Sequence, residues 1–383
     1  MNYYLPTRDE CQALTEKSEA FYCSTKTIEG QVVEMYDYRL AGYTDFFPED
    51  GSNWTELRGL TFVQQADGTW ERNILLQKFF NINQTTDWMY DDVKDKKIVR
   101  IQNKEDGSII SFIKFANGNV RAKSKMSFES PQAVMAQELY DNDEILQDFI
   151  LTMIESNKTP IFELTSPYNQ IVLEYHETSL VLLQVRDSIG DYYSELPTYN
   201  RRWNIRINEH SAYTSSNTLD LLIREKKSNQ DAIEGWVVTF EDGQMAKIKT
   251  DKYLQLHGLI GPDAFRENLL VKTILDGNID DVISALVPGV KKDRIISLDE
   301  KVTKHFNHLV NEFHLLRAEY FGDYYKEDRK RFAIDKKHLN MFSGVMKTLP
   351  HVYSENMSEE QVTIYILQKC NGLNDAKKYL EGL

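Results

Sequence analysis

Between about residues 28 and 253, short runs of β-branched and aromatic residues alternate with turn dipeptides. The clearest of these dipeptides are Asp67-Gly68, Asn117-Gly118 and Asp242-Gly243. Glycine after Asp or Asn readily adopts the left-handed backbone of a tight turn, so each dipeptide is a strong hairpin signal. The pattern restricts this part of the chain to short, mainly antiparallel strands.

The strand pattern is interrupted around residues 256–263, where the chain contains two glycines and a proline. Beyond this point apolar residues recur at helical spacing, and Ser297-Leu298-Asp299-Glu300 has the pattern of a capping box that would begin a helix. Ser358-Glu359-Glu360-Gln361 predicts another helix start, and that helix should end near Gly372. We therefore predict an α+β domain of antiparallel sheets and helices over residues 1–255, followed by a smaller all-α domain over residues 264–383.

The chain of 383 residues is long enough for two such domains. Residues 1–6 lack a charged segment followed by an apolar run, and no stretch approaches the roughly 20 apolar residues of a membrane span, so we expect a cytoplasmic protein. The three cysteines form no CxxC pair, which supports neither a disulfide framework nor a zinc site. A formal net charge of −14 argues against indiscriminate binding to nucleic acid, so any contact with a polynucleotide must be local.

Lys104 begins the segment Lys104-Glu105-Asp106-Gly107-Ser108, which precedes an apolar-rich run over residues 109–115. Because that run turns back at Asn117-Gly118, the lysine should lie at the mouth of a hairpin. A lysine beside two acids is commonly part of a solvated loop, and so short a pattern recurs by chance. Taken alone, the segment favours an ordinary exposed loop.

Glu234 and the pair Lys247 and Lys249 flank the turn at Asp242-Gly243. If that dipeptide is a two-residue turn, the numbers of facing residues sum to 485, so that 238 faces 247 and 236 faces 249. Since side chains alternate along a strand, Glu234, Lys247 and Lys249 would then share one face. The arrangement is either a binding site or a solvent-exposed ladder of opposite charges, which is common on antiparallel sheets.

The order of charged residues along the chain resembles the covalent nucleotidyltransferase superfamily, which comprises polynucleotide ligases and mRNA capping enzymes. That order is Lys104, Glu163, Arg186, Glu234, Lys247 and Lys249. Within the superfamily, the chain is most similar to the bacteriophage single-strand ATP-dependent RNA ligase family, of the T-even phage tRNA-repair type, over nearly its full length. The segments that carry this resemblance are Leu57-Arg58-Gly59, Gln77-Lys78-Phe79-Phe80-Asn81, Lys104-Glu105-Asp106-Gly107-Ser108, Lys123-Ser124-Lys125, Glu234-Gly235 and Lys247-Ile248-Lys249-Thr250-Asp251.

The tail supports the RNA ligase branch of the superfamily. DNA ligases and capping enzymes typically continue with an oligonucleotide-binding β-barrel, whereas residues 264–383 have a helical pattern.

The resemblance implies that Lys104 attacks the α-phosphate of ATP and holds AMP as a lysyl-AMP phosphoramidate. The amine must be neutral to attack, and nearby cations such as Lys247 and Lys249 would favour that form and stabilise the charge that develops on the phosphate. AMP then passes to an RNA 5′-phosphate, and an RNA 3′-hydroxyl displaces it. The implied metal is Mg²⁺, or Mn²⁺ in its place, with Glu234 as the candidate to bind it directly or through water.

The remaining site positions follow from the same resemblance. Glu163 is expected near the ribose, and Asp280 with Asp281 is a candidate second divalent-cation position or else a helix cap. Of the aromatic pair, Phe79 is expected in the core and Phe80 at the nucleotide. The other residues expected at the nucleotide or at phosphates are Arg58, Lys78, Glu105, Gly107, Lys125 and Tyr253.

The implied substrate is single-stranded RNA or a cleaved tRNA, which the helical domain would select. We expect a monomer, located in the host cytoplasm if phage-encoded. Candidate RNA contacts are the segments 121–125 and 201–206 and the basic run from Lys326, because they combine cations with, in two cases, an aromatic residue.

Two rival hypotheses remain open. The first is another nucleotidyltransferase of the superfamily, either a DNA ligase or a capping guanylyltransferase, which a comparison of ATP with GTP and of RNA with DNA ends would separate. The second is a non-catalytic RNA-binding protein, against which the intact set of Lys104, Glu163, Glu234, Lys247 and Lys249 argues.

Overall fold

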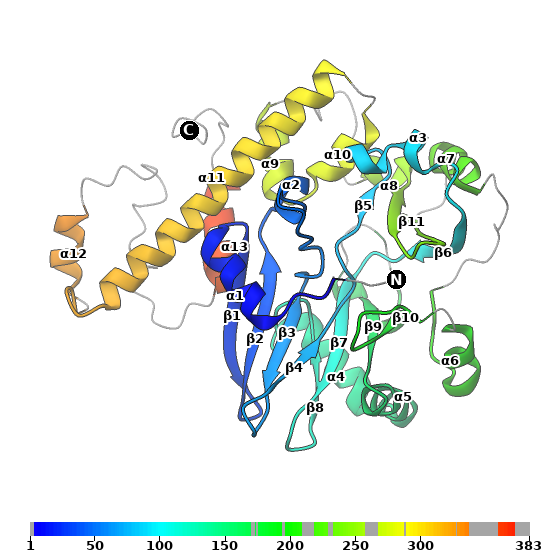
Figure 1. Ribbon diagram of the computed structural model, residues 1–383, viewed down its shortest axis with the longest axis horizontal. Coiled ribbons are helices and arrows are strands. Elements are labelled where there is room, and N and C mark those ends of the chain that lie inside the picture. The colour runs from blue at the N-terminus through cyan, green and yellow to red at the C-terminus, as the bar shows by residue number, and fades with distance from the viewer. Residues whose placement is uncertain are drawn as a thin grey trace.

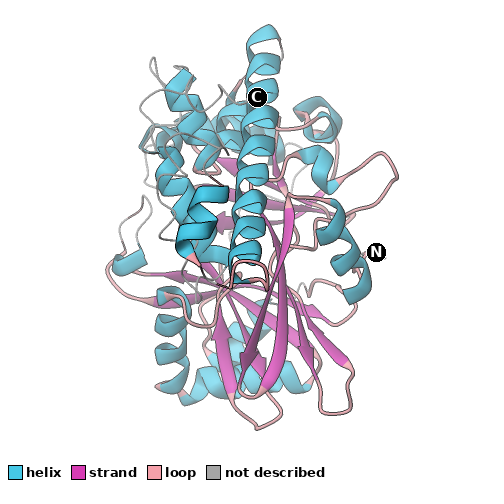
Figure 2. Ribbon diagram, turned by 90° about the vertical axis from the view of Figure 1, so that its left-hand side faces the viewer, coloured by secondary structure: helices cyan, strands magenta, loops and turns pink. Residues whose placement is uncertain are grey.

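The fold is described from a computed structural model of the chain (Figure 1). It describes residues 4–169, 173, 175–193, 196–208, 218–228, 233–256, 267–286, 289–326, 328–336 and 359–371. Within these residues, three four-stranded sheets lie in the first 250 positions, and every later element is a helix (Figure 2). The α+β class and the helical character of the tail are as predicted.

The first sheet is an antiparallel meander in the order β1-β2-β3-β4. Glu29 and Gly30 both have positive φ and make the two-residue turn between β1 and β2. Helix α1 (Arg8–Lys17) packs beside β1 and begins at a capping box in which Thr7 and Glu10 exchange hydrogen bonds. The strands are β1 (Phe21–Ile28), β2 (Gln31–Tyr38), β3 (Leu60–Gln64) and β4 (Trp70–Asn73).

The second sheet has the order β10-β9-β7-β8 and is covered by helices on one face. Its apolar core includes Phe112 of β7 and Phe162 of β9, whose rings meet edge to face, and Phe149 of α5. The elements are β7 (Ser108–Lys114), β8 (Val120–Lys123), β9 (Lys158–Thr165), β10 (Ser179–Asp187), α4 (Pro131–Asp141), α5 (Glu144–Glu155), η2 (Pro167–Asn169) and α6 (Leu196–Trp203).

The third sheet has the order β5-β12-β11-β6, with β5 parallel to β12 and the other pairs antiparallel. Trp236 and Phe240 of β11 share one buried core with Phe21 of β1 and Phe62 of β3, so this sheet packs against the first. The elements are β5 (Phe80–Asn81), β6 (Ile98–Lys104), β11 (Gly235–Phe240), β12 (Met245–Lys249), α2 (Tyr43–Phe46), η1 (Thr86–Trp88), α3 (Tyr90–Val93), α7 (Thr218–Ser228) and α8 (Asp251–Leu256).

The three Asp-Gly and Asn-Gly dipeptides lie in hairpins, as predicted, but each is part of a three-residue loop. At the third hairpin Phe240 pairs with Gln244, Gly243 has a φ of +78°, and its N–H donates to the Phe240 carbonyl. This is the loop in which a left-handed glycine follows a type I turn. The numbers of facing residues therefore sum to 484, with Val237 opposite Lys247 and Gly235 opposite Lys249, and the predicted register was wrong by one.

The tail helices form their own apolar core around the long helix α11, which runs diagonally across Figure 1. Tyr253 and Leu254 of α8 belong to that core, so the tail packs directly against the end of the sheet region. The helices are α9 (Glu267–Leu275), α10 (Ile279–Ala285), α11 (Val290–Phe321), α12 (Arg329–Asp335) and α13 (Glu359–Asn371).

One predicted helix start was wrong and one lies at the edge of the described chain. The capping box at Ser297 lies inside α11, which begins after Gly289, because the buried face extends back to Ile295. Helix α13 begins at Glu359 as predicted, and Ser358 lies outside the described residues. Most of the predicted interruption at residues 256–263 also lies outside them, after α8 ends at Leu256.

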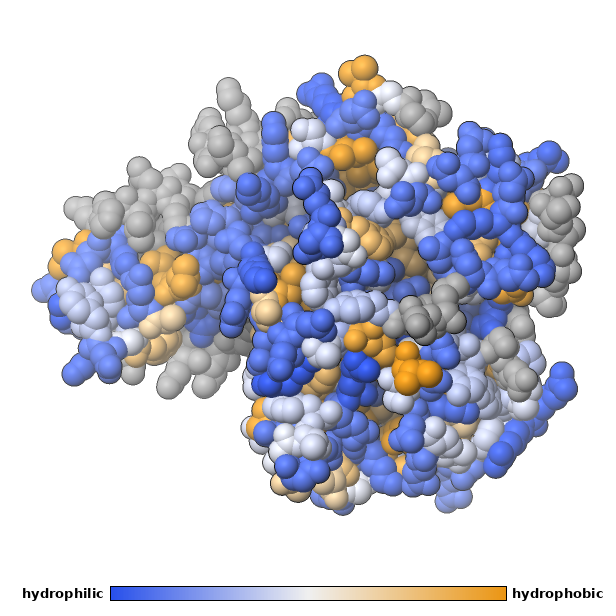
Figure 3. Space-filling model, viewed as in Figure 1, coloured by the Kyte–Doolittle hydropathy of each residue, from blue (hydrophilic) through white to orange (hydrophobic). Residues whose placement is uncertain are grey.

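The visible molecular surface agrees with the high share of charged residues in the chain, 27%. The face seen in Figure 3 is mainly hydrophilic, with hydrophobic residues scattered over it. None of the described helices combines the length and the apolar character that crossing a membrane requires.

Candidate active site

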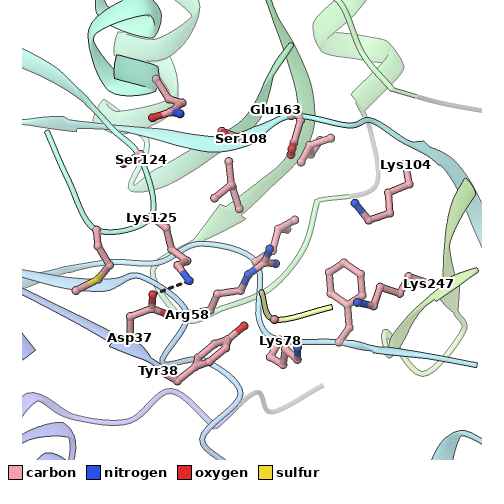
Figure 4. Close-up of a pocket in the computed structure, with 18 of the residues that line it drawn as sticks. Asp37, Tyr38, Arg58, Lys78, Lys104, Ser108, Ser124, Lys125, Glu163 and Lys247 are labelled. Carbon is pink, nitrogen blue, oxygen red and sulfur yellow. Dashed lines mark ion pairs between the residues drawn. The ribbon is translucent and has the colours of Figure 1, made fainter. Parts of the chain in front are cut away.

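A cleft of about 720 Å³ opens where the three sheets meet the tail helices, a volume typical of a small-molecule site. Its walls come from all three sheets, and Leu275, Phe306 and Leu367 of the tail line one end. Side chains from distant parts of the sequence point into it (Figure 4). Of the predicted site residues, the cleft is lined by Arg58, Lys78, Lys104, Glu105, Gly107, Lys125, Glu163, Lys247 and Lys249.

Lys104 is the last residue of β6, and the next strand, β7, belongs to a different sheet. Its Nζ lies 2.8 Å from Glu234 Oε2, and a quarter of its side chain is exposed to the cleft. The amine is therefore accessible, and it is positioned at the junction between two sheets.

The segment after Lys104 is an anchored turn, contrary to the reading as a solvated loop. The buried Asp106 carboxylate accepts hydrogen bonds from the Leu173 N–H at 2.8 Å and from the Tyr253 hydroxyl at 3.0 Å. Tyr175 donates to Glu105 Oε2 at 3.1 Å and accepts from the Asp106 N–H. A Cβ at Gly107 would lie 2.2 Å from the Leu164 carbonyl oxygen, so only glycine permits this approach of β7 to β9.

Glu234 is held between two lysines. Its Oε1 lies 3.0 Å from Lys249 Nζ, and the side chain is only 3% exposed. Although burial acts to raise the pKa of this carboxyl, Lys104 and Lys249 hold the pKa below its ordinary value. Because the Glu234 carboxylate is buried, these charges do not form the solvent-exposed ladder that the sequence had left as an alternative to a binding site.

The corrected register explains how Glu234 reaches Lys249. Lys247 and Lys249 share a face with Val237, and Glu234 comes just before β11 begins. Gly235 has a φ of +149°, and a Cβ there would lie 2.0 Å from the Ile248 carbonyl oxygen. The glycine thus lets the chain turn so that the carboxylate meets the lysines from the end of the strand rather than from its face.

Asp280 and Asp281, near the start of α10, bring two carboxylates to Lys247 and Lys249. Asp280 Oδ2 lies 2.8 Å from Lys247 Nζ, and Asp281 Oδ2 lies 2.8 Å from Lys249 Nζ. Asn81 Nδ2 donates to Asp281 Oδ1 at 3.1 Å. Burial acts to raise the pKa of Asp280, but Lys247 lowers it well below its ordinary value.

No grouping of three or more His, Cys, Asp or Glu suited to a metal ion occurs within the described part of the chain. The role of Asp280 and Asp281 at a second cation position therefore remains a prediction.

Three further cations, Arg58, Lys78 and Lys125, line the opposite wall. Lys125 Nζ lies 2.7 Å from the buried Asp37 Oδ2. Arg58 and Lys78 have no carboxylate partner among the described residues, so their charges are available to an anion. Asp37 and Tyr38, at the end of β2, line the cleft as well and were not predicted, because a strand end gives no sequence signal of its own.

Tyr38 lies among these cations. Lys125 Nζ is 5.1 Å and Lys78 Nζ 5.6 Å from the centre of its ring. Burial acts to raise the pKa of Tyr38, but Lys78, Lys125 and Arg58 lower it overall. The wall is thus strongly electropositive.

Glu163 of β9 lines the same cleft as Lys104. Burial raises the pKa of Glu163 to about 7, although Lys104 opposes the shift. Arg186, by contrast, lies outside the cleft. It is fully buried and bonds the Glu56 carboxylate with two nitrogens, each at 2.8 Å.

The structure reverses the assignment of the aromatic pair. Phe79 lines the cleft, whereas Phe80 is 2% exposed and packs against Tyr43 and Phe46 in the core. Residue 80 begins the short strand β5, where it is buried in the core shared by the first and third sheets, whereas Phe79 lies just before that strand. Tyr253 was also expected at the nucleotide, but its ring is buried in the tail core and its hydroxyl is bonded to Asp106.

Two of the candidate RNA-contact segments are less available than expected. Lys123 is fully buried, and its ammonium donates to the carbonyls of Gly59, Ser124 and Lys125 at 3.0–3.2 Å. Burial lowers the pKa of Lys123 to about 7. Trp203 is 7% exposed and donates to Asp148, so it cannot stack on a base.

A lysine amine beside an acid, in a cleft rimmed by cations between antiparallel sheets, defines an enzyme that acts on a phosphorylated substrate. The RNA ligase family model matches residues 56–253, just over half of the chain, and the chain belongs to this family.

Other known proteins are similar to this chain. A protein of Thermovibrio ammonificans named "Putative RNA ligase" is 25% identical over 320 residues, which are 76% of this chain and 81% of that protein. An archaeal ATP-dependent RNA ligase of known structure is 10% identical, with a TM-score of 0.47, over 94% of this chain and 77% of that one. The Naegleria gruberi RNA ligase with PPi is 14% identical, with a TM-score of 0.39, over 62% of this chain and 76% of that one.

Proposed function

We propose that this RNA ligase uses ATP and joins an RNA 5′-phosphate to a 3′-hydroxyl through a covalent AMP on Lys104. The observation that supports this most directly is the accessible Lys104 amine, 2.8 Å from Glu234, facing a wall that carries Arg58 and Lys78. Neither of these two cations pairs with a carboxylate in the described part of the chain. A lysine amine in a cleft lined by further cations is suited to attack phosphorus, because those cations stabilise the charge that develops on the phosphate.

The reaction would have three steps. The Lys104 nitrogen bonds to the α-phosphorus of ATP, the bond to the pyrophosphate oxygen breaks, and the amine loses a proton. An oxygen of the RNA 5′-phosphate then attacks the same phosphorus, the P–N bond breaks, and Lys104 regains its proton. Finally the RNA 3′-hydroxyl attacks the 5′-phosphorus of the RNA and AMP leaves.

The residues of the cleft divide into groups that suit these steps. Arg58 and Lys78 would hold phosphate oxygens, and Lys247 and Lys249 would do so when the carboxylates that now pair with them give way. Glu163 would face the ribose, where a carboxyl with a pKa of about 7 can donate or accept a hydrogen bond. Phe79, rather than Phe80, would contact the adenine.

A divalent metal is compatible with this set of residues. Mg²⁺ is commonly bound by one or two carboxylates together with substrate phosphates and water, and Glu105 and Glu163 place carboxyl oxygens in the cleft. Glu234 is engaged by two lysines, so it suits a water-mediated contact better than a direct one. The metal would neutralise charge on the phosphates.

The test is incubation with ATP labelled at the α-phosphate and Mg²⁺, followed by denaturing electrophoresis. The wild type should give a labelled band that pyrophosphate discharges, and Lys104→Ala should give none. Intact mass of the purified protein first excludes preformed adenylate. A band with GTP but not ATP would indicate a capping-type transferase, and wild-type labelling of Lys104→Ala would refute the nucleophile.

A finer proposal concerns the substrate. We infer from the resemblance that the enzyme repairs cleaved tRNA and that a helical domain over residues 264–383 selects it. The basic run at the start of α12 would contribute, and Lys326→Ala with Lys330→Ala should slow the sealing of a tRNA cleaved in its anticodon loop more than the sealing of an unstructured oligoribonucleotide. Equal slowing of both would refute selection by this surface.

A further inference from the structure

A second cavity, of about 450 Å³, lies beside the cleft and is not used by the proposed chemistry. Lys78, Phe79 and Met245 line both cavities, so these three side chains form the wall between them. A ligand that extends from one cavity to the other must therefore pass Lys78 and Phe79.

The second cavity has an aromatic lining. Tyr43 and Phe47 are partly exposed, and their rings lie 4.9 Å apart between centres at an angle of 38°. The buried Phe80 supports both, at 5.4 Å from Tyr43 and 6.1 Å from Phe47. Flat rings held in place from below form a surface on which a nucleobase can stack.

Polar groups are placed at the wall of this cavity. Lys78 Nζ lies 5.6 Å from the ring centre of Tyr38, and Tyr38 lines the cleft. Lys78 Nζ also lies 5.6 Å from the ring centre of Phe80, and Phe80 lines the second cavity. The charge of Lys78 thus stands between the two spaces. Gln77 lines the second cavity, and its side-chain amide has no hydrogen-bond partner among the described residues.

From this arrangement we infer that the second cavity binds the 5′-terminal nucleotide of the RNA, an inference that rests on the proposed function. In RNA-adenylate, two phosphates join the adenosine to the 5′-terminal nucleoside of the RNA, one from AMP and one from the RNA. With AMP in the cleft, Lys78 would bind a phosphate at the wall, and the base beyond it would stack on Tyr43 and Phe47. The Gln77 amide can donate to or accept from the edge of any base, so the site would tolerate all four.

The experiment separates the second step of the reaction from the first. Lysyl-AMP enzyme is isolated, and AMP transfer to a 5′-phosphorylated oligoribonucleotide is followed in single turnovers at increasing RNA concentration. Phe47→Leu and Gln77→Ala should raise the half-saturating RNA concentration, by about tenfold for Phe47→Leu given the usual contribution of one stacked base. Both variants should change the rate of lysyl-AMP formation less than twofold. Tyr168→Leu, which removes an aromatic side chain that is 87% exposed elsewhere, is the matched control.

A cross-linking measurement complements the kinetics. RNA with 5-iodouridine at its first position should cross-link to Tyr43 or Phe47 on irradiation, and RNA with the label at the fourth position should not. An unchanged half-saturating concentration, or an equal loss of both reaction steps, would refute the inference while leaving the proposed function intact. Absence of lysyl-AMP in the wild type would instead refute the proposed function itself.

Discussion

Replacing Lys123 by methionine should reveal the energetic consequence of burying its ammonium. Burial lowers the pKa of Lys123 from 10.5 to about 7 in the folded protein. Between these two values the unfolded chain binds more protons than the folded one, so raising the pH stabilises the fold. Below pH 7 both states are protonated and the cost of burial is present in full, whereas above pH 10.5 it is absent.

The magnitude follows from the size of that shift. Each pH unit between about 7 and 10.5 should add about 1.4 kcal/mol to the free energy of unfolding of the wild type, and Lys123→Met lacks this dependence. From pH 7 to pH 9 the wild type should therefore gain about 3 kcal/mol relative to the variant. The absolute difference at pH 7 is less informative, because methionine also leaves three carbonyls without their donor.

The assay is urea denaturation of both proteins at several pH values between 7 and 9. Lys97→Met, at a side chain that is 68% exposed, controls for the loss of a surface lysine and should track the wild type. A constant difference between Lys123→Met and the wild type across this range would refute the reasoning, since it would mean that Lys123 titrates alike in the folded and unfolded states.

Three further predictions concern the cleft and its supports. Phe80→Ala should lower the free energy of unfolding by about 3–5 kcal/mol in urea denaturation. Phe79→Ala should mainly raise the ATP concentration that gives half-maximal lysyl-AMP formation. The opposite pattern would support the assignment made from the sequence. Burial raises the pKa of Glu163 to about 7, so between about pH 5 and 7 the folded protein binds more protons than the unfolded chain. As the pH rises through this range, the free energy of unfolding of the wild type should fall by up to about 3 kcal/mol relative to Glu163→Gln. A pH-independent difference would contradict this. Arg186→Met should destabilise the fold by about 3–5 kcal/mol, because it leaves the Glu56 carboxylate buried without its partner, and adding Glu56→Gln should recover part of that loss.

The sequence predicted best those features that depend on local chemistry. Asp-Gly and Asn-Gly dipeptides located the hairpins, and the cluster of Lys104, Arg58, Lys78 and Lys125 came together in one cleft as the resemblance implied. The hairpins can be predicted without knowing the tertiary structure, because turn geometry is set by a few adjacent residues. The cluster in the cleft joins distant residues, and its prediction came from the family resemblance alone. The helices of the tail were predictable because the spacing of apolar residues along a helix is also a local pattern.

Features that depend on small register differences or on distant contacts were not predictable. Two-residue and three-residue loops share the same Asp-Gly signal, so the pairing of β11 with β12 was misjudged by one residue. The burial of Phe80 and of Lys123 depends on which face packs against another element. The contact of Asp280 with Lys247 joins residues that lie 33 positions apart, on either side of the end of the sheet region, and no local pattern indicates it.

Lys104 ends a strand of one sheet, and only Glu105, Asp106 and Gly107 separate it from Ser108, the first residue of a strand in another sheet. Three residues span at most about 11 Å even when fully extended, and here they are fixed by hydrogen bonds to Tyr175, Leu173 and Tyr253. The covalent chain and these hydrogen bonds therefore hold the two sheets together along this edge. Lys104 thus occupies the junction at which two sheets that wall the cleft are covalently joined.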